Sequence, residues 1–302
     1  MKVDNSPICP AFFVLGVQKS GTSTLHNWLN QNPNISLPTL KETHFFSDES
    51  HFQKGLTWYN SWFSNNQSKI RVEIDPSYIF VKESAERLSK TVYPAPSFII
   101  IFRDPLTRAY SHYRMSVQRG IESLQFTDAL LAEKKRLEHD RDTFSFLNHS
   151  YLTRGNYSKQ LQHFQRIFPD SNFLFLKFDE LFESASRRDM YSKVCDFLSV
   201  PADIHNVNLD IISRPASTSK FTWLSRLMHR NSKLKEVIGK LVPSYKFRAN
   251  LFNFIDESNK TPAKGKTLFN KSKLPQDILD WANHEIEILS GLTKLELTDW
   301  LN

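Results

Sequence analysis

The stretch FFVLGVQKSGTSTLHNWL, Phe12–Leu29, decides the fold of this chain. It begins as an uncharged apolar run, passes through small polar residues around Gly21, and ends with Leu25, Trp28 and Leu29 at helical spacing. This order predicts a buried strand, a tight turn and a helix. The N-terminus of such a helix offers backbone N–H groups and a positive dipole end, and both favour a bound oxyanion.

Four short apolar runs predict strands that are buried on both faces: Ala11–Val17, Ile70–Ile74, Phe98–Phe102 and Phe173–Lys177. Helical patterns lie between and after them, such as Asp128–Asp140 and Pro275–Ser290. Strands that alternate with helices predict an α/β fold, P-loop-like and three-layered, with a central, mainly parallel sheet flanked by helices. In such folds we expect ligands at the carboxyl ends of the strands.

Length and composition limit the class of protein. With 302 residues, 40% of them apolar, the chain can form a single domain over residues 1–302, with its core at about 11–200 and a basic helical part at about 205–302. No stretch has the roughly 18 uncharged apolar residues of a membrane span, and the first ten residues lack the apolar core of a signal peptide. Cys9 and Cys195 are too few for a disulfide framework. We therefore predict a cytoplasmic protein with no integral membrane segment.

The positive charge is unevenly distributed along the chain. The net charge is +7, and between Arg214 and Arg248 nine basic residues accompany one acid, Glu236. Such an excess favours anionic ligands. No helix-turn-helix, zinc or RNA-binding signature accompanies it, so we predict no nucleic-acid partner. A solvated basic face and an anion-binding role remain equally open for this segment.

The turn in the opening stretch matches only half of a phosphate-binding pattern. Gly16 and Gly21 enclose four residues, as in a P-loop. A nucleotide triphosphatase would carry a lysine directly after the second glycine, whereas this chain has Thr22 and Ser23 there, and its Lys19 comes before the glycine. The hydroxyl groups can donate to an oxyanion without a metal ion. The position of Lys19 before the glycine is evidence against one candidate function, that of a P-loop small-molecule kinase.

A second candidate anion site follows the strand at Phe98–Phe102. Arg103 comes at the carboxyl end of this strand, and Ser111 lies two turns along the following helix. A guanidinium group can bind a phosphate through two hydrogen bonds, and a serine can reach the same anion. The alternative for Arg103 is a structural pairing with Asp104. Two anion sites at the ends of two strands indicate a nucleotide with phosphates at both its 5′ and 3′ positions.

Several motifs occur in an order that resembles one family. VQKSGTSTL, KETHFF, GLTWY and IFRDPLTRAYSHYR are similar to the sulfotransferases that use 3′-phosphoadenosine 5′-phosphosulfate (PAPS), especially the glycosaminoglycan enzymes of the heparan sulfate type and their bacterial relatives. The resemblance extends from about Phe12 to Phe182. It implies PAPS as the donor, adenosine 3′,5′-bisphosphate (PAP) as the product, and no metal ion. It implies a 5′ site made of Lys19, Ser20, Gly21, Thr22, Ser23 and Thr24, and a 3′ site made of Arg103 and Ser111.

The KETHFF motif supplies the acceptor side. A hydroxyl acceptor loses its proton as it attacks sulfur, and a carboxylate or an imidazole can take that proton. The resemblance implies that Glu42 is the general base and that His44 lines the same catalytic site. Lys19 is expected to stabilise the leaving phosphate, where negative charge develops. The predicted acceptor is a small hydroxylated metabolite, such as a natural product, or a carbohydrate.

The remaining site assignments also follow from the resemblance. The predicted contacts to the acceptor are His44, Asp75, Tyr78 and Tyr157. Many relatives carry a lysine where this chain has Ile74, next to Asp75. An acidic side chain facing the acceptor would suit a substrate with positive charge. The loop ISRPASTSK resembles a loop that covers the nucleotide in relatives, which implies Arg214 and Lys220 as further donor ligands.

Overall fold

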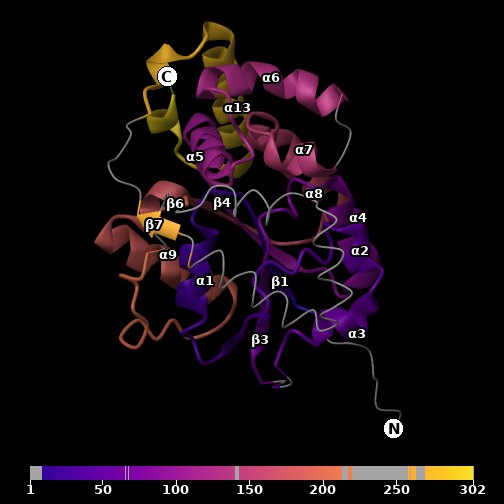
Figure 1. Ribbon diagram of the computed structural model, residues 1–302. Coiled ribbons are helices and arrows are strands. Elements are labelled where there is room, and N and C mark those ends of the chain that lie inside the picture. The colour runs from indigo at the N-terminus through magenta and orange to yellow at the C-terminus, as the bar shows by residue number, and fades with distance from the viewer. Residues whose placement is uncertain are drawn as a thin grey trace. The chain divides into compact units, whose positions relative to one another are not determined.

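The computed structural model describes residues 9–301 apart from 65, 67, 140–142, 213–216, 220–257, 259 and 263–268. The chain divides into two compact units, whose helices and strands are drawn in Figure 1. The first unit comprises Met1–Asp104, Tyr157–Ser213 and Glu285–Trp300. The second unit comprises Pro105–Asn156, Arg214–His284 and the last two residues.

The first unit contains a five-stranded parallel sheet with the strand order β2-β3-β1-β4-β5. The strands are β1 (Phe12–Gly16), β2 (Ile35–Ser36), β3 (Ile70–Ile74), β4 (Ser97–Phe102) and β5 (Phe173–Lys177). All four predicted strands and their parallel arrangement are confirmed. The edge strand β2 was not predicted, because two residues are too short to show a strand period.

Helices cover both faces of this sheet. They are α1 (Thr22–Leu29), α2 (Glu49–Phe52), α3 (Gly55–Asn60), α4 (Lys82–Thr91), α8 (Tyr157–Ile167) and α9 (Ser184–Phe197). Alternate residues of the central strands enter two separate apolar clusters, Phe13 and Phe98 on one face and Val14 and Ile99 on the other. Figure 1 shows α1 and α9 on one side of the sheet and α4 and α8 on the other. The predicted three-layer α/β arrangement is confirmed.

The second unit is mainly helical. It contains α5 (Pro105–Gln118), α6 (Phe126–His139), α7 (Thr143–Asn148), the 3₁₀ turn η1 (Thr153–Gly155), and an antiparallel pair, β6 (Ser217–Ser219) with β7 (Lys260–Pro262). Helix α13 (Gln276–Thr293) begins in this unit and ends in the first. Leu106, Leu130 and Ile278 contribute to the apolar core of the second unit. The predicted helices at α6 and α13 are confirmed. Within the described ranges, no helix has the length and apolar character needed to cross a membrane.

Candidate active site

The segments that follow the parallel strands β1, β3 and β4 lie close together at the carboxyl ends of these strands. The N–H of Asp75, directly after β3, donates to the carbonyl of Val14 in β1 at 3.1 Å. Arg103, directly after β4, donates from Nη1 to the carbonyl of Lys19 at 2.8 Å, and its guanidinium lies 4.1 Å from the centre of the Phe178 ring. The two predicted anion-binding segments therefore lie together at the carboxyl ends of the strands, where sheets of this kind bind ligands.

Residues 17–21, here called the glycine loop, join β1 to α1 in a tightly held turn. Ser20 is completely buried, and its Oγ donates to the carbonyl of Val17 at 2.5 Å. Gly21 has φ +85°, and a Cβ added there would lie 2.2 Å from Cδ1 of Leu181. Gly21 caps α1, and the described residues provide no side-chain cap at this helix end. An anion bound there, near Lys19, would complete the cap.

The KETHFF segment, Lys41–Phe46, contacts the helix that the glycine loop begins. Lys41 Nζ donates to Oγ of Ser23 in the first turn of α1 and lies 3.4 Å from Oε1 of Glu42. Thr22 and Thr24 of the same turn are buried. The side chain of Glu42 remains 32% exposed, so it can meet a ligand. The structure thus brings the predicted base close to the predicted 5′ site and adds Lys41, which sequence analysis did not single out.

A buried carboxylate holds His44. Nδ1 of His44 lies 2.9 Å from Oδ2 of Asp75, which also accepts the backbone N–H of His44 at 2.8 Å. Oδ1 of Asp75 accepts the N–H of Ser77 at 2.9 Å. Burial by itself lowers the pKa of His44, but the charge and hydrogen bond of Asp75, together with the charges of Glu42 and Glu73, raise it to about 9. His44 is therefore positively charged at neutral pH and cannot accept a proton, which favours Glu42 as the base.

Glu73 on β3 is a second buried carboxylate, and sequence analysis missed it. It accepts hydrogen bonds from Thr43 Oγ1 at 2.5 Å, from the Tyr78 hydroxyl at 2.9 Å and from the Tyr59 hydroxyl. Burial, followed by the negative charge of Asp75, raises the pKa of Glu73 to about 7, although the three hydroxyl groups oppose the shift. The hydrogen bond between Thr43 and the buried Glu73 fixes the position of the middle of the KETHFF segment.

Three predicted site residues have a backbone conformation that is rare for residues with a side chain. Lys19 has φ 75°, Glu42 has φ 57° and His44 has φ 51°. The other described non-glycine residues with positive φ are Ser199, Asp203 and Lys294. A conformation of this kind costs about 1–3 kcal/mol and persists only where the surroundings enforce it. Its concentration in the glycine loop and the KETHFF segment is typical of a functional site.

Three of the predicted acceptor contacts are inside the protein. Asp75, Tyr78 and Tyr157 have no exposed surface. Both carboxylate oxygens of Asp75 are engaged by the chain, and the Tyr157 hydroxyl donates to the carbonyl of Arg103 at 2.9 Å. Their role at the acceptor stays a prediction, and in this structure each side chain contacts a neighbouring segment. The side chain of His44 is 41% exposed and lies against the carboxylate of Asp75.

The structure leaves other assignments as predictions. Arg103 lies in the first unit and Ser111 on α5 of the second, so their joint role at a 3′-phosphate stays a prediction. Ile74 is buried in an apolar cluster. Arg214 and Lys220 lie outside the described residues. In the part of the chain that is described, no three His, Cys, Asp or Glu side chains are grouped as a metal site would require.

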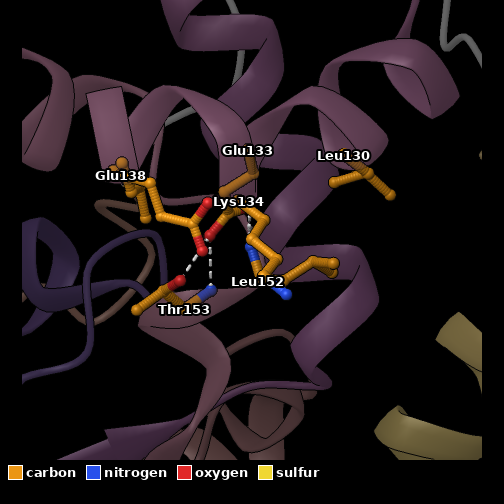
Figure 2. Close-up of a pocket in the computed structure, with 7 residues that line it drawn as sticks. Leu130, Glu133, Lys134, Glu138, Leu152 and Thr153 are labelled. Atoms are coloured by element: carbon orange, nitrogen blue, oxygen red, sulfur yellow. Dashed lines mark hydrogen bonds between the residues drawn. The ribbon is translucent and has the colours of Figure 1, made fainter. Parts of the chain in front are cut away.

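A separate pocket of about 300 Å³ lies in the second unit (Figure 2). Its lining consists of Leu130, Glu133, Lys134, Leu137, Glu138, Leu152 and Thr153, none of which is a predicted site residue. The buried carboxylate of Glu133 accepts the backbone N–H groups of Leu152 at 2.6 Å and Thr153 at 2.8 Å. Because backbone N–H groups occupy this carboxylate, Glu133 has a structural role in the second unit, and we assign no chemistry to the pocket.

Comparison with known proteins identifies a family and several relatives. A family model described as "Sulfotransferase domain" matches residues 10–300. Human heparan sulfate glucosamine 3-O-sulfotransferase 3A1 is 29% identical over 198 residues, which are 65% of this chain and 46% of the relative. The human form 3B1 is 30% identical over 192 residues, which are 63% of this chain and 46% of the relative. The chain therefore spans about half the length of these relatives. A solved sulfotransferase from Alicyclobacillus acidocaldarius has the same fold, with a TM-score of 0.66, 20% identity, and coverage of 98% of this chain and 100% of that one.

Proposed function

This chain belongs to the sulfotransferase domain family, and we propose that it transfers a sulfuryl group from PAPS to a hydroxyl group and releases PAP. The observation that carries the proposal is the contact between the KETHFF segment and α1. Lys41 joins Ser23 of the helix to Glu42, so a partly exposed carboxylate lies near a helix N-terminus that has no side-chain cap among the described residues. Sulfuryl transfer needs an anchored anionic donor and a base near it, and this arrangement supports both.

On the donor side, the glycine loop and the first turn of α1 are proposed to bind the 5′-phosphosulfate. Sulfuryl transfer leaves little covalent work for the protein, so positioning and charge stabilisation account for most of the catalysis. When the bond between sulfur and the 5′-phosphate oxygen breaks, its electron pair remains on that oxygen. Lys19 is proposed to neutralise the developing charge there. Arg103 and Ser111 are proposed to bind the 3′-phosphate.

On the acceptor side, Glu42 is proposed to take the hydroxyl proton as the acceptor oxygen bonds to sulfur. His44 is unsuited to this step because it already carries a proton at neutral pH. Asp75 fixes its Nδ1, which leaves Nε2–H as the donor available to a ligand. We propose that His44 orients the acceptor next to Glu42 by donating this hydrogen bond.

We propose a carbohydrate or a small hydroxylated metabolite as the acceptor. The human relatives are named for the glucosamine of heparan sulfate, and the match covers 46% of each. The charge of His44 favours neutral or anionic acceptors over cationic ones. The cytoplasmic location stays a prediction from the sequence.

The test supplies the purified chain with PAPS or with ATP and a panel of acceptors: a glucosamine-containing oligosaccharide, a phenol and an aliphatic alcohol. Mass spectrometry then identifies the products. We expect a sulfated acceptor and PAP with PAPS, and no phosphorylated acceptor with ATP. ADP and a phosphorylated acceptor would instead identify a kinase and overturn the proposal. Reactions without an acceptor measure the background transfer to water.

A further inference from the structure

Lys41 lies between the anion-binding helix end and the proposed base. Its Nζ contacts Oγ of Ser23 on one side and Oε1 of Glu42 on the other. An ammonium group has three N–H donors, and the hydrogen bond to Ser23 uses one of them. The Lys41 side chain is 34% exposed, so a ligand at the helix end can reach it.

We propose that Lys41 is a second catalytic cation, one that binds the sulfuryl group itself while the group moves from donor to acceptor. This inference rests on the proposed function. Lys19 belongs to the glycine loop, where the leaving phosphate is proposed to bind, whereas Lys41 is adjacent to Glu42, where the acceptor hydroxyl is proposed to lose its proton. The sulfuryl group passes between these two positions, and Lys41 contacts Glu42 at the second and Ser23 in the helix turn that follows the glycine loop.

The chemical step balances without a further reactant. The acceptor oxygen forms a bond to sulfur, the bond from sulfur to the 5′-phosphate oxygen breaks, and that electron pair stays on the phosphate. The acceptor proton passes to the carboxylate of Glu42. Lys41 exchanges no proton: it donates a hydrogen bond to a sulfuryl oxygen and keeps the group in line. Donor binding also gives Lys41 a new anionic partner, which frees Glu42 from the ion pair.

The alternative is a surface ion pair between neighbouring residues, a kind of contact worth about 0–1 kcal/mol. An ordinary pair of this kind does not require the positive φ of Glu42 or a contact to Ser23. Lys41 also influences the helix beyond Ser23. Burial, followed by the positive charge of Lys41, lowers the pKa of His26 in α1 to about 4. His26 is therefore neutral at neutral pH, and of these two side chains Lys41 is the one that carries a positive charge.

The test compares Lys41→Met with Lys54→Met. Lys54 is an exposed residue 4.6 Å from the Trp58 ring centre, and its substitution removes the same charge from the same unit. We measure PAP release from PAPS, with water and with an acceptor from the panel, and PAP binding by calorimetry. For Lys41→Met we expect turnover to fall about 10²–10³-fold. PAP lacks the sulfuryl group, so PAP affinity should change less than about threefold.

Lys41→Arg keeps the charge and should recover part of the lost turnover, while Lys54→Met should behave as the unmodified protein. Unchanged turnover in Lys41→Met would overturn the inference and leave the proposed function intact. Parallel losses of turnover, PAP affinity and thermal stability would also overturn it, because they indicate a structural residue. If the unmodified protein released no PAP from PAPS, the proposed function would fail first and the inference with it.

Discussion

One oxygen atom, Oδ2 of the buried Asp75, contacts both Nδ1 of His44 at 2.9 Å and the backbone N–H of His44 at 2.8 Å. The same atom thus sets the charge of the imidazole and holds the backbone of residue 44 at a positive φ. Asp75 follows β3 directly, so the rigid sheet fixes the position of this ion pair. The KETHFF segment gains a defined conformation although it has no regular secondary structure around Glu42.

Asp75→Asn should lower the pKa of His44 from about 9 toward its ordinary value of 6.5. The substitution removes the negative charge of Asp75, which is the largest contribution that raises this pKa, while burial continues to favour the neutral imidazole. The measurement is an NMR titration of the His44 ring. Asp170→Asn, an exposed substitution elsewhere in the first unit, is the matched control and should leave the titration unchanged. A midpoint that stays near 9 in Asp75→Asn would show that Asp75 does not hold the proton on His44.

Glu42→Gln should lower turnover by about 10²–10⁴-fold, because an amide cannot accept the proton of the attacking hydroxyl. PAP affinity should stay near that of the unmodified protein, since the nucleotide is proposed to bind the glycine loop. Glu49→Gln is the control: Glu49 lies on α2, is 63% exposed and pairs with Arg87. Full activity of Glu42→Gln with the same acceptor would exclude Glu42 as the base.

Lys19→Ala should lower turnover about 10²–10³-fold by removing the cation proposed to stand beside the leaving oxygen. Arg103 contacts the carbonyl of Lys19, so the substitution leaves this backbone contact in place. PAP release from PAPS gives the rate, and circular dichroism checks that the fold is kept. Unchanged turnover in a folded Lys19→Ala protein would show that the lysine of the glycine loop takes no part in the reaction.

The strands could be predicted because a parallel strand covered on both faces is apolar along its whole length. The glycine loop and the KETHFF segment could be recognised in the sequence because each is a contiguous motif, and the role of Glu42 as the base stays a prediction. Lys41 could not, because its contact with Ser23 arises where a loop folds back onto a helix, and no local pattern records such a contact.

The burial of Asp75 could not be predicted for a related reason. Val72 and Ile74 of β3 enter one apolar cluster, so Glu73 and Asp75 point to the opposite side of the sheet. The alternation was visible in the sequence, but whether that side meets solvent or a layer of side chains depends on tertiary packing. Tyr59 and Tyr78 pack against that side of the sheet, and the hydroxyl groups of both donate hydrogen bonds to Glu73.

Glu73→Gln should reduce the pH dependence of stability between about pH 5 and 8. Folded Glu73 keeps its proton up to a pKa of about 7, whereas the unfolded chain releases it near 4.5, so the folded state loses stability as the pH rises through this window. The loss is on the order of 3 kcal/mol and cannot occur in the glutamine variant. Urea unfolding of both proteins at pH 5 and pH 8 measures it, with Glu86→Gln on the exposed face of α4 as the control. Parallel pH dependence in the unmodified and Glu73→Gln proteins would contradict the raised pKa.

Gly21→Ala should destabilise the first unit by about 1–3 kcal/mol and abolish PAP binding. The residue has φ +85°, and the added Cβ would lie 2.2 Å from Cδ1 of the buried Leu181 and 3.4 Å from the Phe178 ring. Either the loop or these side chains must move, and the loop carries the proposed phosphate contacts. Gly291→Ala is the matched control. Gly291 lies in α13, and no atom of the described residues lies within 4 Å of an added Cβ, so alanine there should be neutral or stabilise the protein by up to about 1 kcal/mol. Urea unfolding and calorimetry with PAP distinguish the two variants, and intact PAP binding by Gly21→Ala would show that the donor does not depend on the conformation of the glycine loop.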